Sequence, residues 1–182
     1  MTSLPVHLDA TAPSLMFGAS DYVALSAACD WLRNGHAVAL VTVVHSDDAA
    51  RYAMGALWAV NDRGEIAGPA DTTDRIGAGV AAVMRERDFA ERALDWCDIA
   101  VDALPVAGVS KPCSLRLLVE PQHAEQPLAR LLERIVRGEH VARRVCLTTG
   151  EASLHPGRQV PATLVLTAND LIRHFGPPVP GT

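Results

Sequence analysis

Aromatic residues, lysine and long hydrophobic runs are all scarce in this sequence. Phe, Trp and Tyr make up 4% of 182 residues, so a core must be built mainly from Ala, Val and Leu. The N-terminus lacks the basic and apolar regions of a signal peptide. The run "AVALVTVV" is far shorter than the roughly 20 apolar residues that cross a bilayer. We therefore expect a cytoplasmic protein that does not bind membranes.

Several function classes are excluded by composition and by missing motifs. The net charge of -5 argues against nucleic-acid binding, which needs concentrated positive charge. The four cysteines form no C-x-x-C pair, so we expect no zinc site and no secreted disulfide framework. The sequence has no phosphate-binding loop, dinucleotide-binding glycine motif, nucleophile elbow or H-E-x-x-H motif. We expect no catalysis by the chain itself.

The first two thirds of the chain alternate helical and strand patterns. Ser20 can cap a helix with Asp21 in its first turn, and Asn34-Gly35 ends that helix. The next segment, "HAVALVTVV", is apolar on both faces, as a central strand is. The later predicted elements are a hairpin (Ala56–Val60, a turn at 61–64, Glu65–Ala67), a helix from Thr73 or Asp74 to about Arg87, and strands at Cys97–Ala103 and Ser114–Glu120, the last ended by Pro121.

The last third repeats the order helix, glycine, strand. Glu125–Arg137 has a strong helical period, Gly138 closes it, and "HVARRVCLTTG" follows as a strand. The segments "WLRNGHAVALVTVV" and "RIVRGEHVARRVCLTT" match in this order, which implies two related units. Because helix–Gly–strand is a common arrangement, coincidence remains an alternative. We further expect a strand in "QVPATLVLT" and a short helix at Asn169–Phe175.

These patterns predict an α/β fold, with a mixed α+β fold as the alternative. We expect two related helix–strand lobes packed as one compact unit, without a Rossmann domain. The predicted boundaries are a flexible arm at 1–18, a domain at 19–175 with lobes 19–122 and 123–175, and a disordered tail at 176–182.

Two loops contain groups that can bind ligands. In "HSDDAAR", His45, Asp47 and Asp48 offer hard metal ligands, although a solvated loop is the simpler interpretation. In "GPADTTDRIGAG", a helix start can hold an anion, but Asp71 and Asp74 would repel it. We favour the simple interpretation in both loops, and we expect His36 and His140 to have packing or turn roles.

Four segments together resemble the XdhC/CoxI family, whose members assist the maturation of molybdenum hydroxylases such as xanthine dehydrogenase and carbon monoxide dehydrogenase. They are "WLRNGHAVALVTVV", "GALWAVNDRGEIAG", "PCSLRLLVEP" and "LARLLERIVRGEHVARRVCLTT". They occur in the family's order between Asp30 and Thr149. The resemblance implies an accessory protein that holds the molybdenum cofactor (molybdopterin), or contacts the target enzyme or its maturation machinery.

The family motifs survive here in part. Of the glycine- and proline-rich first loop only Gly55 remains, and the "IAG" segment ends at Gly68. The family's Gly-Gly-Cys cysteine falls at or beside Asp74, and "CSL" replaces its Cys-Gly-Gly pattern. Longer members continue into a Rossmann-type domain. The resemblance thus implies a cofactor site made of Cys113, Lys111, Gly55, Gly68 and Asp74.

Cys113 has two interpretations. It is either a cofactor or sulfur ligand activated by the nearby charge of Lys111, or a small buried residue that opens a strand. We expect the remaining cysteines, Cys29, Cys97 and Cys146, to lie in the core.

Alternatives to cofactor handling remain open. A degenerate, non-enzymatic homologue would keep the fold as a dimerisation or docking module, and a third possibility is a protein that binds a different small ligand. We also expect a homodimer, because short strands leave open sheet edges.

Overall fold

The computed structural model describes residues 17–49, 52–69, 94–101, 113–122, 124–158 and 164–176. In chain order they form α1 (Phe17–Arg33), β1 (Val38–Ser46), β2 (Leu57–Asn61), β3 (Ile66–Ala67), β4 (Asp95–Val101), β5 (Cys113–Gln122), α3 (Glu125–Val136), β6 (Val141–Cys146), β7 (Ala152–Pro156), β8 (Leu164–Leu166) and β9 (Asp170–Phe175).

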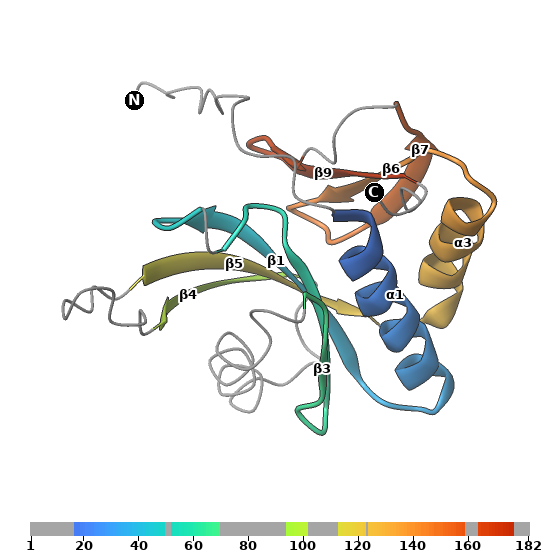
Figure 1. Ribbon diagram of the computed structural model, residues 1–182, viewed down its shortest axis with the longest axis horizontal. Coiled ribbons are helices and arrows are strands. Elements are labelled where there is room, and N and C mark those ends of the chain that lie inside the picture. Colours follow the sequence, from blue (N-terminus) through green and yellow to red (C-terminus); the bar gives the residue numbers. More distant parts are fainter. Residues whose placement is uncertain are drawn as a thin grey trace.

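The strands form two antiparallel sheets (Figure 1). The first sheet has the order β3-β2-β1-β5-β4, and the second has the order β7-β6-β9-β8. Each strand pairing in the described ranges is antiparallel. The fold is therefore α+β, the mixed alternative of the predicted class, and the described sheets lack the parallel pairing of a Rossmann domain.

The first sheet is built around β1, as its apolar sequence predicts. This strand pairs with β2 on one side and with β5 on the other, and Val38 to Val44 are all buried. The predicted hairpin is also present, because the Asn61 side chain accepts hydrogen bonds from the backbone N–H groups of Arg63 and Glu65 at 3.0 and 2.9 Å. Gly64 completes the turn with φ of 78°.

The two faces of the first sheet belong to different apolar clusters. On one face, α1 and α3 pack side by side and cover Val38, Leu40, Leu57 and Ala59 (Figure 1). The opposite face carries a cluster made of Ala39, Val41, Val43, Tyr52, Ala56, Trp58, Val60, Cys97, Cys113, Leu115, Leu117 and Val119. Cys113 therefore lies on the face of the sheet that points away from the helices.

A third apolar cluster joins the two sheets. Val44 and Leu118 of the first sheet pack against Val145 and Leu171 of the second. This contact places the second sheet next to the N-terminal part of α1. In Figure 1, the start of α1 lies below β6 and β9.

Two predicted element boundaries and the predicted role of one charged residue differ from the structure. The first helix begins at Phe17, so Ser20 lies inside it and does not cap it. Asp21 is buried and pairs with Arg173, so its role is not that of an exposed charge in a first turn. Pro121 lies within β5, where it pairs with Ala39 of β1. It is tolerated because β4 reaches only Val119 on the other side, so no ladder partner is lost there.

The segment Asn169–Phe175 is predicted to be a short helix, but Asp170–Phe175 form strand β9 instead. Leu171, Arg173 and Phe175 are buried in alternation with Ile172 and His174, which is the period of a strand. The strand period was hard to recognise in the sequence because Arg173, one of the three inward residues, is charged. The edge strand β7, whose residues are mostly exposed, was not predicted at all.

Both sheets use a left-handed glycine between a helix and an inner strand. Gly35 follows α1 and Gly138 follows α3, and each has φ of 82°. The strands after them, β1 and β6, are both inner strands of their sheets. The sequence pattern helix–Gly–strand is thus repeated in the structure.

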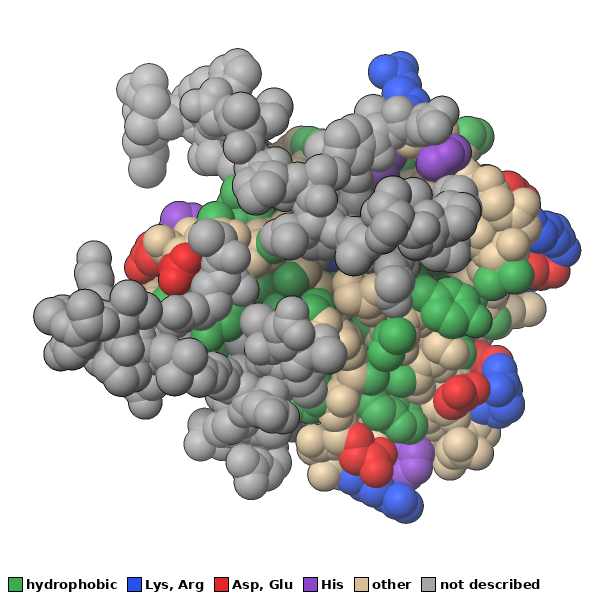
Figure 2. Space-filling view, viewed as in Figure 1, with side chains coloured by type: hydrophobic (Ala, Val, Ile, Leu, Met, Phe, Trp, Pro, Cys, Tyr) green, Lys and Arg blue, Asp and Glu red, His purple; other side chains and the backbone are tan. Residues whose placement is uncertain are grey.

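The outer surface is mixed in character. Figure 2 shows hydrophobic side chains along α1 with charged side chains around them, and Tyr22 and Val23 are exposed on this helix. Neither of the described helices has the length and hydrophobicity needed to cross a membrane. The helix predicted near Thr73–Arg87, the N-terminal arm up to residue 16 and the tail from residue 177 lie outside the described residues.

Candidate functional site

The candidate site is the end of the first sheet where β1 stops and β5 begins. Because the two strands are antiparallel, Ser46 at the end of β1 pairs with Leu115 near the start of β5. The backbone N–H of Asp47 then donates to the Ser114 carbonyl oxygen at 3.2 Å. This pairing brings Cys113 next to the loop that follows β1.

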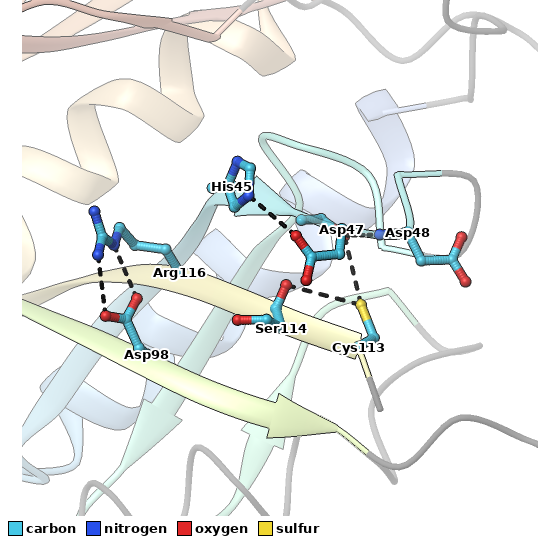
Figure 3. A network of polar contacts seen from close by, with 8 residues as sticks. His45, Asp47, Asp48, Asp98, Cys113, Ser114 and Arg116 are labelled. Carbon is cyan, nitrogen blue, oxygen red and sulfur yellow. Dashed lines mark hydrogen bonds and ion pairs between the residues drawn. The ribbon is translucent and has the colours of Figure 1, made fainter. Parts of the chain in front are cut away.

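The Cys113 thiol lies between that loop and its own strand (Figure 3). Its sulfur is 3.9 Å from the Ser46 Oγ, and the thiol donates to the Ser114 carbonyl oxygen at 3.8 Å. The residue is 4% exposed and belongs to the apolar cluster on that face of the sheet. These contacts are those of a packed core cysteine at a strand end.

The loop beside Cys113 carries two acidic side chains, Asp47 and Asp48. Asp47 Oδ1 lies 3.3 Å from His45 Nε2, and the backbone N–H of Asp48 donates to Ser46 Oγ at 3.1 Å. On the opposite face of the sheet, Asp98 accepts two hydrogen bonds from Arg116, at 2.8 and 3.1 Å (Figure 3).

The Arg116 guanidinium is paired with the Asp98 carboxylate through its Nε and Nη2 atoms. Its hydrogen bonds hold the pKa of Asp98 below the ordinary value, and the carboxylate in turn raises the pKa of Arg116. A cation already bound to a carboxylate in this way offers little to an incoming anion. The described part of this end of the sheet is therefore poorly suited to phosphate or another oxyanion.

The metal interpretation of the "HSDDAAR" loop receives no support. Within the described ranges, no group of three or more His, Cys, Asp or Glu side chains is placed to hold a metal ion. His45 and Asp47 instead contact each other with more than half of each side chain exposed. Both side chains are solvated where β1 ends, although His45 still belongs to the strand.

Gly55 closes the loop after β1 through its backbone. Its φ is 84°, and its N–H donates to the Val43 carbonyl oxygen at 2.7 Å. A β-carbon at this position would meet the Leu164 Cβ at 3.4 Å. The positive φ gives Gly55 a structural reason to be glycine. Because its N–H group already donates to Val43, it has no donor left for a cofactor phosphate.

Gly68 lies away from Cys113 and packs against Trp58. A β-carbon on Gly68 would lie 2.5 Å from Trp58 Cδ1 and 2.7 Å from the Leu57 carbonyl oxygen. Gly68 follows β3 at one edge of the sheet, whereas Cys113 begins β5, beyond β2 and β1. Of the residues in the predicted cofactor site, Gly55 and Cys113 lie near the same end of the sheet and Gly68 does not. Lys111 and Asp74 lie outside the described residues.

The two histidines beside strand starts have local roles. His36 Nδ1 lies 2.9 Å from Asp62 Oδ1 in the β2–β3 turn, and the His140 carbonyl oxygen accepts from the Gly157 N–H at 2.8 Å. These are turn and packing contacts, as the sequence predicts.

The cysteines away from the site differ in burial. Cys29 and Cys97 are buried, as predicted, and burial raises the pKa of Cys29 to about 11. Cys146 is partly exposed at the end of β6, so its assignment to the core is wrong. Hydrogen bonds from the Thr149 side chain and from the backbone N–H groups of Thr149 and Thr148 lower its pKa. The signal in the sequence is the turn "CLTTG", which follows a strand directly.

Comparison with known proteins gives one likeness of structure. No family model matches the sequence, and no curated protein matches it either. A crystal structure described as a xanthine dehydrogenase from Bacillus halodurans matches with a TM-score of 0.50 and 14% sequence identity. The match covers 85% of this chain and 53% of the other, so this chain spans about half the length of that protein. The likeness shows that the chain shares its fold with part of a protein described as a xanthine dehydrogenase.

Proposed function

We propose that this chain is an accessory protein of a molybdenum hydroxylase system, and that it assists maturation by contacting a protein partner. The observation that carries the proposal is the shared fold along 85% of the chain with a protein described as a xanthine dehydrogenase. The four sequence segments between Asp30 and Thr149, which resemble XdhC/CoxI accessory proteins, add independent support.

The surroundings of Cys113 favour a protein partner over a cofactor. The thiol is almost fully buried, and the loop beside it carries the acidic side chains of Asp47 and Asp48. Among the described residues at this end of the sheet, Arg116 lies on the opposite face and is paired with Asp98. Molybdopterin carries a phosphate, and the described residues beside Cys113 include no Lys or Arg that would balance its charge. The described residues therefore do not fit the cofactor.

Cofactor binding at Cys113 is the second candidate. It is favoured by the position of the thiol, which lies at a strand end directly beside the Ser46 hydroxyl. A thiolate is a soft ligand suited to molybdenum or to carrying sulfur. This candidate requires the loop after β1 to move, because that loop and the apolar cluster cover the sulfur in the present structure.

A homodimer forms part of the proposal. Among the described strands, β3 and β4 are the edges of the first sheet, and β7 and β8 are the edges of the second. Open edges present unpaired backbone groups that a second copy can cover. Size-exclusion chromatography with light scattering should give twice the chain mass, and a monomer at micromolar concentration would contradict this part.

The accessory role is tested with a cofactor-free molybdenum hydroxylase from the same organism. We expect the chain to bind this enzyme saturably in analytical ultracentrifugation. It should also raise the fraction of enzyme that becomes active when molybdenum cofactor is added. No binding together with no gain in active enzyme would refute the proposed function.

The variant Cys113→Ala separates the two candidates. If the chain acts through a protein contact, the variant keeps both effects, and titration of the wild-type chain with molybdopterin shows no saturation. If Cys113 holds the cofactor, the titration saturates for the wild type and is lost in the variant. Cys97→Ala is the matched control, since Cys97 is equally buried in the same apolar cluster. Any loss that both variants share reflects packing.

A further inference from the structure

Five polar side chains, which we call the polar layer, are buried where the two sheets meet. They are Asp21 of α1, Thr42 of β1, Glu120 of β5, Arg143 of β6 and Arg173 of β9, and each is at most 7% exposed. Arg143 Nη1 donates to Glu120 Oε2 at 2.7 Å, and Arg173 Nη2 donates to Asp21 Oδ1 at 2.7 Å. Two buried ion pairs thus connect the second sheet to the first sheet and to α1.

The strand register places the polar layer between apolar layers. Arg143 and Arg173 are direct partners across β6 and β9. The next inward pairs on these strands are apolar on both sides: Val145–Leu171 and Val141–Phe175. The first of these pairs packs on Val44 and Leu118, and the second belongs to the cluster around α1 and α3.

The first sheet contributes two buried polar residues, Thr42 and Glu120, to the face that meets Arg143 and Arg173. Thr42 pairs directly with Leu118, so the two share a face of the sheet, and Glu120 lies two residues further along β5 on that face. Leu118 packs in the cluster with Val145 and Leu171. Thr42 and Glu120 therefore belong to the face that meets the second sheet.

Several features show that burying the polar layer lowers the free energy of unfolding. The two guanidinium groups are cross-strand neighbours of like charge, an arrangement that destabilises a sheet unless it is neutralised. Among the described residues, Arg173 Nη1 and Thr42 Oγ1 are buried without a hydrogen-bond partner. Burial also raises the pKa of Asp21, and the attraction of Arg173 only partly opposes this effect. An apolar layer of the same volume would avoid these costs.

We propose that the polar layer is a conformational device that fixes the alignment of the second sheet on the first, although it lowers the stability of the fold. Sliding β6 and β9 by two residues would bring an apolar pair opposite Glu120 and bury both arginines among apolar side chains. The charges thereby exclude shifted alignments. A wholly apolar face would accept them, since its successive layers are alike.

The first test replaces the four charged groups together, as Asp21→Leu, Glu120→Met, Arg143→Met and Arg173→Met. We expect a denaturation midpoint equal to or above that of the wild type. Methyl NOE contacts of Val44 and Leu118 with Val145 and Leu171 should change from one set to several sets or broaden. A lower midpoint, or one unchanged set of NOE contacts, would overturn the proposal.

A second test uses single substitutions. Thr42→Val removes the unpartnered hydroxyl at constant shape, and we expect it to raise the midpoint. A lower midpoint would mean that the hydroxyl stabilises the layer, against the proposal. Glu120→Gln leaves Arg143 without a counter-charge, so the folding equilibrium constant should fall about a hundredfold or more.

The control for Glu120→Gln is Glu139→Gln in the partly exposed Arg134–Glu139 pair. Since exposed pairs contribute little, this change should lower the folding equilibrium constant less than about fivefold. Equal effects of the two substitutions would overturn the special role of the buried pairs.

Discussion

The cysteines show how much the surroundings of one residue decide its chemistry. Cys113, Cys97 and Cys29 are packed in apolar clusters, whereas Cys146 lies partly exposed at a hairpin turn. Cys113 stood out in the sequence because of its position before a strand. Its contacts are nevertheless those of a core residue.

The first prediction at the residue scale concerns thiol reactivity. Alkylation with iodoacetamide at neutral pH, followed by mass spectrometry, should modify Cys146 first and Cys29 last. The reason is that hydrogen bonds from Thr148 and Thr149 favour the Cys146 thiolate, while burial disfavours that of Cys29.

Thr149→Val should slow the modification of Cys146, because it removes the side-chain donor. Thr148→Val is the matched control, since Thr148 acts through its backbone N–H and should leave the rate unchanged. Faster modification of Cys113 than of Cys146 would contradict the packed environment of Cys113.

The second prediction at this scale concerns Gly68. Gly68→Ala places a methyl group against Trp58 and the backbone of Leu57, so we expect a loss of about 1–3 kcal/mol in the free energy of unfolding. Denaturant titration measures this loss, and the fluorescence of Trp58 should change with it.

Gly35→Ala is the control for Gly68→Ala. Nothing lies within 4 Å of a β-carbon on Gly35, so its loss comes from backbone strain at φ of 82° and leaves the tryptophan signal unchanged. An undisturbed Trp58 signal in Gly68→Ala would show that the glycine is not required by packing.

At the scale of the element, turn hydrogen bonds decide between helix and strand in the last segment. Thr167 N–H donates to the Asp170 carbonyl oxygen at 2.8 Å, and the Thr167 Oγ1 accepts from the Asp170 N–H at 2.9 Å. These bonds close a hairpin between β8 and β9. They place Ala168 and Asn169 in the turn and make Asp170 the first residue of β9, so no helix starts at Asn169.

The prediction at this scale is that Thr167→Val weakens the β8–β9 hairpin. The loss of the hydroxyl acceptor should cost about 1 kcal/mol of unfolding free energy. Hydrogen exchange followed by mass spectrometry should speed up in residues 164–175. Thr167→Ser keeps the hydroxyl and is the matched control. Equal exchange in the two variants would show that the turn does not depend on this group.

At the scale of the whole molecule, two sheets and a pair of helices share three apolar clusters. The periodic segments were predictable, because β1 and α3 have clear strand and helix patterns. The join between the sheets was not, since beside its apolar cluster it buries Asp21, Arg143 and Arg173, which a sequence pattern places on the surface. The acidic character of the candidate site could be read from Asp47 and Asp48, but the burial of Cys113 depends on pairing with a strand far away in the chain.

Global stability should fall at high pH, and Cys29 gives the reason. The thiol has an ordinary pKa of 9.0, which burial first and the nearby charge of Glu125 second raise to about 11 in the folded protein. The contribution of the protonated Cys29 thiol to the free energy of unfolding is complete below pH 9 and is lost as the pH rises through 11. Unfolding titrations of the wild type and of Cys29→Ala across pH 8–11 should show a smaller pH slope in the variant. Parallel curves would contradict this assignment.

The pairing of β1 with β5 constrains how the chain can fold during its synthesis. Val38 pairs with Gln122, so the central strand of the first sheet remains without this neighbour until residue 122 has left the ribosome. The second sheet, by contrast, needs only residues 141–175, which follow one another through short connections. A ribosome that stalls before residue 122 therefore holds a nascent chain whose most hydrophobic strand has an open edge.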